Sequence, residues 1–252
     1  MSNADFMEKL LDGANVEWKR LGDVARIKNG KDHKALGKGE FPVFGSGGIM
    51  RYADTYAYNK PSVLIPRKGS LGNLFFVDVP FWNVDTIFYT EIDETQISPK
   101  FLYYFLTTAG LGEMNQAGGV PSQTQSVLNE LKIPIPCPDT PEKSLKIQAE
   151  IVRILDAFTA LTTELTSRKK QYNYYRDQLL SFDEGGVEWK ALGEIGKFIR
   201  GKRFTKADYV EDGISVIHYG EIYTRYGVST KLSLRFVQKW LHHYATQNPK
   251  ML

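Results

Sequence analysis

The chain has 252 residues, of which 42% are hydrophobic and 13% aromatic, which is enough to bury a substantial core. The formal net charge of +3 is compatible with nucleic-acid binding but too small to indicate it. The single cysteine, Cys137, excludes an internal disulfide and a cysteine-based zinc cluster, and it favours the reducing cytoplasm. No segment approaches the roughly 18 consecutive apolar residues that a membrane span needs, so we expect a cytoplasmic protein without such a span.

Residues 1–137 are expected to form a first domain. Apolar runs bounded by glycine, proline, asparagine and aspartate predict strands within it. The strands are expected at residues 41–44, 62–65, 74–79 and 86–89. One helix is expected at residues 99–109, before a polar loop and the apolar segment 131–136. The first domain is therefore predicted to be a β-rich unit of the α+β class.

Cationic and amide side chains in this domain are candidates for DNA contacts. Between residues 19 and 38, lysines and arginines outnumber acids and are interleaved with glycines, which lets backbone amides and long cations approach phosphates. Around Arg67 and Gln123, two glycine-bounded turns carry guanidinium, hydroxyl and amide groups, which are suited to reading base edges. The candidate DNA-binding residues are Lys28, Lys31, Lys34, Lys38, Arg51, Arg67, Lys68, Ser70, Gln116, Gln123, Thr124 and Gln125. Alternatively, each of these segments is an ordinary solvated loop or surface turn.

Residues 138–184 are predicted to form one long helix, with Thr140 as its cap and Pro141 at its first position. Its apolar residues are spaced alternately four and three apart, a heptad pattern that indicates a coiled coil. The helix-pairing residues are Ile147, Ile151, Ile154, Phe158, Leu161, Leu165, Tyr172, Tyr175 and Leu179, with Arg168 as the single polar member of the series. Such a helix would span roughly 50 Å. The alternative is an amphipathic helix that packs only on its own domain.

The segment 187–194 repeats residues 16–23, and Trp18 recurs as Trp189 at an offset of 171 residues. This offset is far longer than the roughly 20 to 50 residues of a solenoid repeat, so it indicates that a whole domain begins again. A strand is expected at residues 214–217, but the strand pattern is lost from residue 232 onward. Residues 185–252 are therefore expected to form only the truncated start of a second domain.

Sequence motifs for catalysis are missing. There is no phosphate-binding loop, and the glycines of residues 45–48 lack the third glycine of a dinucleotide fingerprint. The Asn-Pro-Pro-aromatic motif of amino-methyltransferases is also absent. The four histidines have no ligand spacing with carboxylates or with the cysteine, so no metal site is expected; they are His33, His218, His242 and His243. We expect a protein that is not an enzyme, and a standalone nuclease or methyltransferase is the disfavoured alternative.

The order of these segments resembles the specificity subunits of Type I restriction-modification systems. The resemblance lies in the opening phrase at residues 16–24, the polar loop followed by residues 131–136, the helix start at residues 148–156, and the return of the opening phrase at residue 187. It implies target-recognition domains that bind double-stranded DNA for partner methyltransferase subunits, with restriction or translocase subunits as further partners. It also implies that this chain binds no cofactor and that adenosylmethionine, ATP and magnesium belong to the partner subunits.

Full members of that family have two complete recognition domains and two long helices, whereas this sequence predicts one of each and a fragment. We interpret the chain as a shortened form that arose by a frameshift or a truncation. Because the single helix leaves its heptad pattern unpaired, we expect an antiparallel homodimer that reads a palindromic split DNA site. Two alternatives stay open: an interaction or scaffold protein that uses the coiled coil, and an inactive remnant of a specificity subunit.

Overall fold

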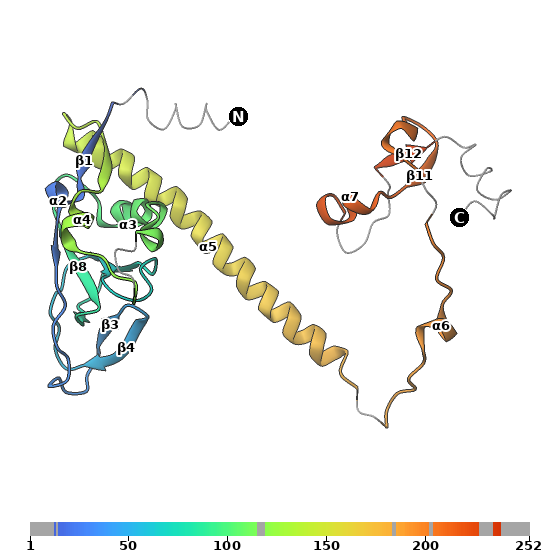
Figure 1. The fold of residues 1–252 in the computed structure, drawn as a ribbon, viewed down its shortest axis with the longest axis horizontal. Coiled ribbons are helices and arrows are strands. Elements are labelled where there is room, and N and C mark those ends of the chain that lie inside the picture. Colours follow the sequence, from blue (N-terminus) through green and yellow to red (C-terminus); the bar gives the residue numbers. More distant parts are fainter. Residues whose placement is uncertain are drawn as a thin grey trace. The chain divides into compact units, whose positions relative to one another are not determined.

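The computed structural model describes residues 13, 15–114, 119–182, 185–201, 204–226 and 234–237. The chain divides into two units, Met1–Leu179 and Leu180–Leu252. The first unit contains a sheet domain and the long helix α5, which extends well beyond that domain (Figure 1). Within the described ranges, no helix combines the length and the apolar character needed to cross a membrane.

Two sheets and a two-stranded ribbon build the sheet domain. The larger sheet is antiparallel and has the order β2 (Ala25–Lys28), β8 (Ile87–Ile92), β5 (Ser62–Pro66), β6 (Phe75–Val77). The smaller sheet has the order β4 (Gly48–Ala53), β3 (Phe41–Gly45), β7 (Trp82–Asn83), in which β3 and β7 run parallel. The ribbon pairs β1 (Val16–Arg20) with β9 (Lys132–Pro136). The ribbon therefore joins the beginning and the end of the domain.

Three helices of the sheet domain each bury one leucine completely. The helices are α2 (Leu21–Val24), α3 (Pro99–Thr108) and α4 (Gln125–Asn129). Leu21, Leu102 and Leu128 are 0% exposed and share one core with Val63 of β5 and Ile133 of β9. Each such side chain contributes about 1.5 to 3 kcal/mol by leaving water. This core holds the ends of the strands, and the loops that follow them, in fixed positions.

The predicted α+β class is confirmed, with a β-rich domain followed by a long helix. The predicted strands at 41–44, 62–65, 74–79 and 86–89 correspond to β3, β5, β6 and β8. The predicted helix at residues 99–109 corresponds to α3. These elements could be predicted because their apolar runs are long enough to be distinguished from the polar residues that border them. Strand β7 has only two residues, which is too short for such a pattern.

Helix α5 runs from Pro141 to Leu179, inside the predicted range 138–184. Its first turns pack on the sheet domain, where Ser144, Ile147 and Gln148 are buried. From residue 157 to residue 182, by contrast, every residue is exposed. The helix is thus anchored at its start and leaves the domain for the remainder of its length (Figure 1).

The predicted helix-pairing residues divide into two groups along α5. Ile147 is 8% exposed, Ile151 packs against the core of the sheet domain, and Ile154 is partly buried. The later residues are more than half exposed: Phe158, Leu161, Leu165, Tyr172, Tyr175 and Leu179. Packing on its own domain therefore accounts for the start of the heptad pattern only. The exposed group is called the apolar stripe below.

The second unit contains a small sheet and two short helices. The sheet has the order β10 (Tyr209–Val210), β12 (Arg235–Val237), β11 (Ile214–Val216), and the helices are α6 (Leu192–Ile195) and α7 (Tyr219–Thr224). Strand β11 lies where a strand was predicted. Strand β12 corrects the expectation that the pattern is lost from residue 232, since it is the central strand and Val237 is 5% exposed. A three-residue strand is too short to show alternation. Apart from residues 234–237, that tail lies outside the described residues.

Candidate nucleic-acid interface

The basic loop, residues 28–40, is fixed to the turn between β7 and β8, residues 83–86. The backbone N–H of Lys31 donates to the Asn83 carbonyl over 2.9 Å. A Cβ atom at Gly30 would lie 1.9 Å from a carbonyl oxygen of the same turn, so only glycine permits this approach. The β7–β8 turn therefore determines where the basic loop begins.

The same turn holds the Arg67 loop, residues 67–73. The backbone N–H groups of Arg67 and Lys68 both donate to the Thr86 carbonyl, over 2.8 and 3.2 Å. The hydroxyl of Thr86 accepts a hydrogen bond from the backbone N–H of Ser46, which lies in the turn between β3 and β4. One residue of the β7–β8 turn thus positions two neighbouring loops.

The polar loop, residues 119–125, connects the Arg67 loop to the basic loop. The Pro121 carbonyl accepts a hydrogen bond from the N–H of Gly69 over 2.9 Å. At the other end of the polar loop, the Gln125 amide donates to the side-chain oxygen of Asn29 over 3.3 Å. Three loops that are far apart in the sequence therefore form one continuous surface, called the three-loop surface below.

The three-loop surface is basic. Its loops contain six lysine or arginine residues and two acidic residues. The side chains predicted to bind DNA that are exposed are those of Lys31, Lys34, Lys38, Lys68, Ser70 and Thr124, whereas Arg67 and Gln125 are partly buried. Exposed cations on a rigid backbone suit phosphate contacts, because phosphate binding depends on charge rather than on sequence. The predicted residue Gln116 lies outside the described residues.

Gln123 corrects the expectation that it reads bases. Its side chain is 2% exposed, and its amide donates to the Pro66 carbonyl over 2.6 Å. Its backbone N–H donates to the Arg67 carbonyl over 3.0 Å. A buried amide cannot reach a base edge, so Gln123 instead attaches the polar loop to the Arg67 loop. No local pattern predicts this burial, since a polar residue in a glycine-bounded loop is usually exposed.

Two further predicted cations are engaged within the domain. The guanidinium of Arg51 donates to the carbonyls of Leu36 and Gly37, over 2.6 and 3.0 Å, and so shapes the basic loop. The ammonium of Lys28 lies 3.5 Å from the Glu91 carboxylate. Arg51 therefore holds the backbone of the basic loop. The charge of Lys28 is partly neutralised by Glu91.

Asp32 introduces a negative charge among the lysines of the basic loop. A hydrogen bond from the backbone N–H of Lys34 lowers the pKa of Asp32 below its ordinary value of 3.8. The carboxylate is consequently ionised at neutral pH, where it braces the turn that presents Lys34. Its negative charge also reduces the local attraction for phosphate. The positive charge of this loop comes mainly from Lys31, Lys34 and Lys38.

The β7–β8 turn itself was not predicted as part of the site. The Asn83 side chain, 1% exposed, closes the turn by donating to the Ile87 carbonyl over 2.7 Å. The sequence does contain a signal, because Asn83 and Asp85 interrupt two apolar runs and both residue types favour turns. That signal identifies a turn, but not the two loops that the turn binds.

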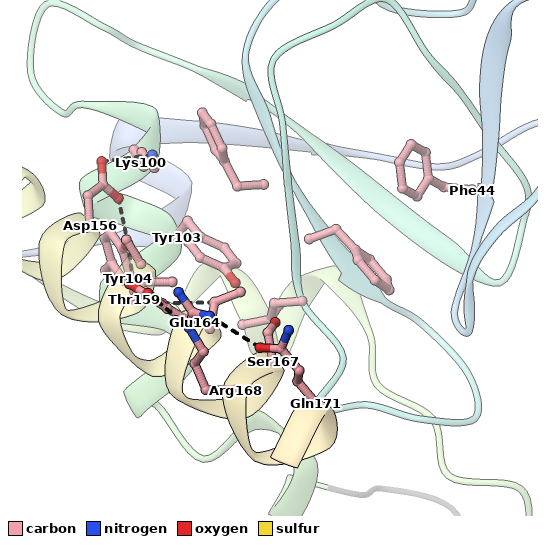
Figure 2. A pocket seen from close by; sticks show the side chains of 15 residues that line it. Phe44, Lys100, Tyr103, Tyr104, Asp156, Thr159, Glu164, Ser167, Arg168 and Gln171 are labelled. Atoms are coloured by element: carbon pink, nitrogen blue, oxygen red, sulfur yellow. Dashed lines mark hydrogen bonds and ion pairs between the residues drawn. The ribbon is translucent and has the colours of Figure 1, made fainter. Parts of the chain in front are cut away.

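A cleft of about 1150 Å³ lies between α5 and the sheet domain (Figure 2). Its lining contains two ion pairs, Lys100 with Asp156 at 2.8 Å and Arg168 with Glu164 at 3.6 Å. Because these charges cancel, the cleft is less suited to phosphate than the three-loop surface. The residues of the apolar stripe are absent from its lining. In the described part of the chain, no cluster of three histidine, cysteine, aspartate or glutamate residues could hold a metal ion.

The family model for the Type I restriction modification DNA specificity domain matches residues 14–172. The chain is 44% identical over 218 residues to the Type I restriction enzyme EcoR124I/EcoR124II specificity subunit of Escherichia coli, a match that covers 80% of this chain and 53% of that protein. It is 36% identical over 249 residues to the EcoprrI specificity subunit of Escherichia coli, covering 84% of this chain and 62% of that protein. The chain thus spans between half and two thirds of the length of these relatives.

The fold is similar to that of a solved Type I restriction-modification S subunit from M. genitalium. The TM-score is 0.56 at 20% sequence identity, over 90% of this chain and 63% of the other. At this level of identity the similarity concerns the fold, namely a sheet domain followed by a long helix.

Proposed function

Because the chain belongs to the family of Type I restriction-modification DNA specificity domains, we propose that it is a DNA-recognition subunit of a Type I restriction-modification complex. The three-loop surface binds double-stranded DNA, and the chain directs partner methyltransferase subunits, and with them restriction subunits, to the bound site. The observation that carries this proposal is that the β7–β8 turn binds the basic loop and the Arg67 loop through backbone hydrogen bonds, and that the polar loop is hydrogen-bonded to both of these loops.

The loops divide the work of recognition. Lys31, Lys34 and Lys38 are exposed on the basic loop and contact phosphates, which supplies affinity for any sequence. The backbone of Arg67 is fixed by its bond to the β7–β8 turn, and the side chain of Gln125 is held near the basic loop by Asn29. Their guanidinium and amide groups are of the types that read guanine and adenine. Rigid presentation matters because a bidentate contact tolerates little displacement.

Catalysis is carried out by the partner subunits. In this proposal adenosylmethionine is bound by the methyltransferase subunit, and ATP and magnesium by the restriction subunit. The present chain selects the DNA sequence at which these subunits act.

The apolar stripe of α5 pairs with the same stripe of a second copy. Its leucine and aromatic side chains are more than half exposed, and each contributes about 1.5 to 3 kcal/mol when fully buried. Since α5 is attached to the sheet domain at its start, antiparallel pairing places the two sheet domains at opposite ends of the helix pair. A two-fold axis then relates the two three-loop surfaces, so the dimer reads an inverted repeat with a spacer.

The proposal is tested by purifying the chain together with its methyltransferase subunit and selecting bound duplexes from a random-sequence pool. We expect enrichment of a two-part inverted sequence. Binding of the methyltransferase subunit without any enrichment would contradict sequence recognition and favour an inactive remnant. Failure to bind both the methyltransferase subunit and DNA would favour a scaffold protein that uses the apolar stripe.

A further inference from the structure

The last attachment of α5 to the sheet domain is a cluster of four polar side chains, Lys100, Tyr104, Asp156 and Thr159, called the Asp156 latch below. Beyond Thr159, no hydrogen bond or ion pair joins α5 to the sheet domain among the described residues. The earlier contacts lie around Ser144, Ile147 and Gln148 near the helix start. Among the described residues, the latch is therefore the hydrogen-bonded contact between α5 and the sheet domain that is farthest from the start of the helix.

The latch joins α3 to α5 by direct hydrogen bonds (Figure 2). The Tyr104 hydroxyl donates to one Asp156 oxygen over 2.5 Å, and the Lys100 ammonium donates to the other over 2.8 Å. The Tyr104 hydroxyl also lies 3.2 Å from the hydroxyl of Thr159, one turn further along the helix. Both carboxylate oxygens of Asp156 are thus held by the domain, which fixes the rotation and the tilt of α5 together.

Aromatic rings hold the domain side of the latch in place. The ammonium of Lys100 lies 5.6 Å from the centre of the Phe76 ring on β6. Tyr103 packs at 6.2 Å from the same ring and at 5.5 Å from Tyr104. Lys100 is therefore held by a ring on the sheet, and Tyr104 by a ring that itself packs on the sheet.

The charges of the latch stabilise one another. Burial raises the pKa of Asp156, but hydrogen bonds from Lys100 and Tyr104 outweigh it, so this pKa lies below its ordinary value. The hydrogen bond to Asp156 raises the pKa of Lys100. The ion pair is therefore intact throughout the neutral range.

We propose that Lys100, Tyr104 and Asp156 are positioning residues that set the direction in which α5 leaves the sheet domain, and through it the distance between the two half-sites that a dimer reads. The second part rests on the proposed function. From Asp156 to Leu179 the helix extends about 35 Å. A change in tilt of about 10° would move its end by about 6 Å, which is close to two base-pair steps of about 3.4 Å.

The direction of the helix is tested on the full chain without DNA. Spin labels at Lys132 of β9 and Lys170 of α5, both exposed, report the distance between domain and helix in a Cys137→Ser background. Excess unlabelled chain suppresses distances between copies. In the Tyr104→Phe/Asp156→Ala variant we expect the distance distribution to broaden and its maximum to shift by several ångströms. An unchanged distribution in the folded variant would overturn the proposal.

Two further variants separate positioning from folding. Glu150→Gln removes an exposed ion pair with Arg153 on the same helix, at 2.6 Å, and should leave the distribution unchanged. Tyr104→Phe alone keeps the ring and removes only the hydroxyl, so it should fold and still broaden the distribution. If Glu150→Gln broadens the distribution as much as Tyr104→Phe, the effect is not specific to the latch and the proposal fails.

The spacing is tested by mapping modified adenines after co-expression with the methyltransferase subunit. The Tyr104→Phe/Asp156→Ala variant should keep the wild-type half-site sequences and accept additional spacer lengths. A wild-type spacer in a variant whose distances have shifted would overturn the link to spacing. If the wild-type chain itself yields no two-part motif, the proposed function fails, and the spin-label distances still decide whether the latch sets the helix direction.

Discussion

Gly30 and Gly47 lie in turns of the same domain and differ in what a side chain would meet. A Cβ atom at Gly30 would lie 1.9 Å from the Val84 carbonyl oxygen, whereas one at Gly47 has no neighbour within 4 Å. We expect Gly30→Ala to lower the free energy of unfolding by about 1 to 3 kcal/mol and to weaken DNA binding, because the basic loop must move. Gly47→Ala should change stability by less than about 0.5 kcal/mol. Chemical denaturation measures both variants. Equal stabilities of the Gly30→Ala and Gly47→Ala variants would contradict the close approach of Gly30 to the Val84 carbonyl.

Gln123 and Thr124 are adjacent, but only Gln123 is buried. Gln123→Ala leaves the Pro66 carbonyl without its donor, which should cost about 1 to 3 kcal/mol of unfolding free energy. Thr124→Ala, with an exposed side chain, should cost less than about 0.5 kcal/mol. Urea denaturation of both variants measures the difference. A stable Gln123→Ala variant with altered sequence choice would restore the role in base reading that the sequence suggested.

Lys31 and Arg67 are expected to affect DNA binding in different ways. Lys31→Ala should weaken binding to all duplexes alike and reduce the slope of log affinity against log salt by about 1. Arg67→Ala should reduce discrimination between the selected and a scrambled duplex by about 1 to 3 kcal/mol. Fluorescence anisotropy on both duplexes at several salt concentrations measures these quantities. The proposed division of labour is wrong if the two variants lose affinity equally on both duplexes.

Exposure was easier to predict for the lysines than for the amides. Lys31, Lys34 and Lys38 are exposed as expected, because a lysine is almost never fully buried. Gln123 has a composition and setting typical of a surface loop, and its burial depends on the distant Pro66 carbonyl. The complete burial of Gln123 distinguishes it from the partly buried Gln125, and the local sequence does not encode this burial.

At the scale of elements, the repeated phrase shows the limit of a sequence pattern. Residues 16–20 form β1 because β9 supplies an antiparallel partner. The repeat at residues 188–190 has no strand assignment, and Trp189 is 77% exposed against 56% for Trp18. Among the described residues the second unit offers no counterpart of β9. The repeat therefore predicts the same structure only where the same pairing partner is present.

The apolar stripe of α5 is tested by charge substitution. Leu161→Glu/Leu165→Glu places like charges on the stripe and should convert the proposed homodimer to a monomer at micromolar concentration, because buried charges repel and lose solvation. Lys170→Glu alters an exposed residue outside the heptad series and should leave the proposed homodimer intact. Sedimentation velocity measures both variants. A monomeric wild-type chain would contradict pairing through the stripe.

The pKa shifts of Asp156 and Lys100 predict how the contribution of the Asp156 latch to stability depends on pH. The lowered pKa of Asp156 means that its contribution to stability is present above 3.8 and is lost as the pH falls through the lowered pKa. The raised pKa of Lys100 means that its contribution is present below 10.5 and is lost as the pH rises past the raised pKa. The difference in unfolding free energy between wild type and Asp156→Ala should therefore be constant between these values and shrink outside them. Partial exposure keeps this difference small.

The long helix and the main strands could be predicted because each carries its own periodic pattern. The convergence of the three loops could not, because it depends on hydrogen bonds between Lys31, Thr86 and Gly69 and their distant partners. The departure of α5 from the sheet domain is a similar case. The heptad pattern continues through Ile151 and Phe158 without a break, although one is packed and the other is exposed.

At the scale of the whole molecule, a recognition surface is joined to a long helix through the sheet domain. The three-loop surface is attached to the sheet domain, the sheet domain holds the start of α5, and the free part of α5 presents the apolar stripe. In the proposed dimer, a pair of such chains reads two half-sites at a separation that the helices determine. Residues 14–172, which the family model matches, contain all the parts that this account uses except the end of α5.

The most direct test of this account is a sequencing map of modified adenines in random DNA after co-expression of the chain with its methyltransferase subunit. The account predicts a two-part motif in which the second half-site is the inverted copy of the first, separated by a spacer of fixed length. Modification without a sequence motif, or at one undivided site, would contradict it.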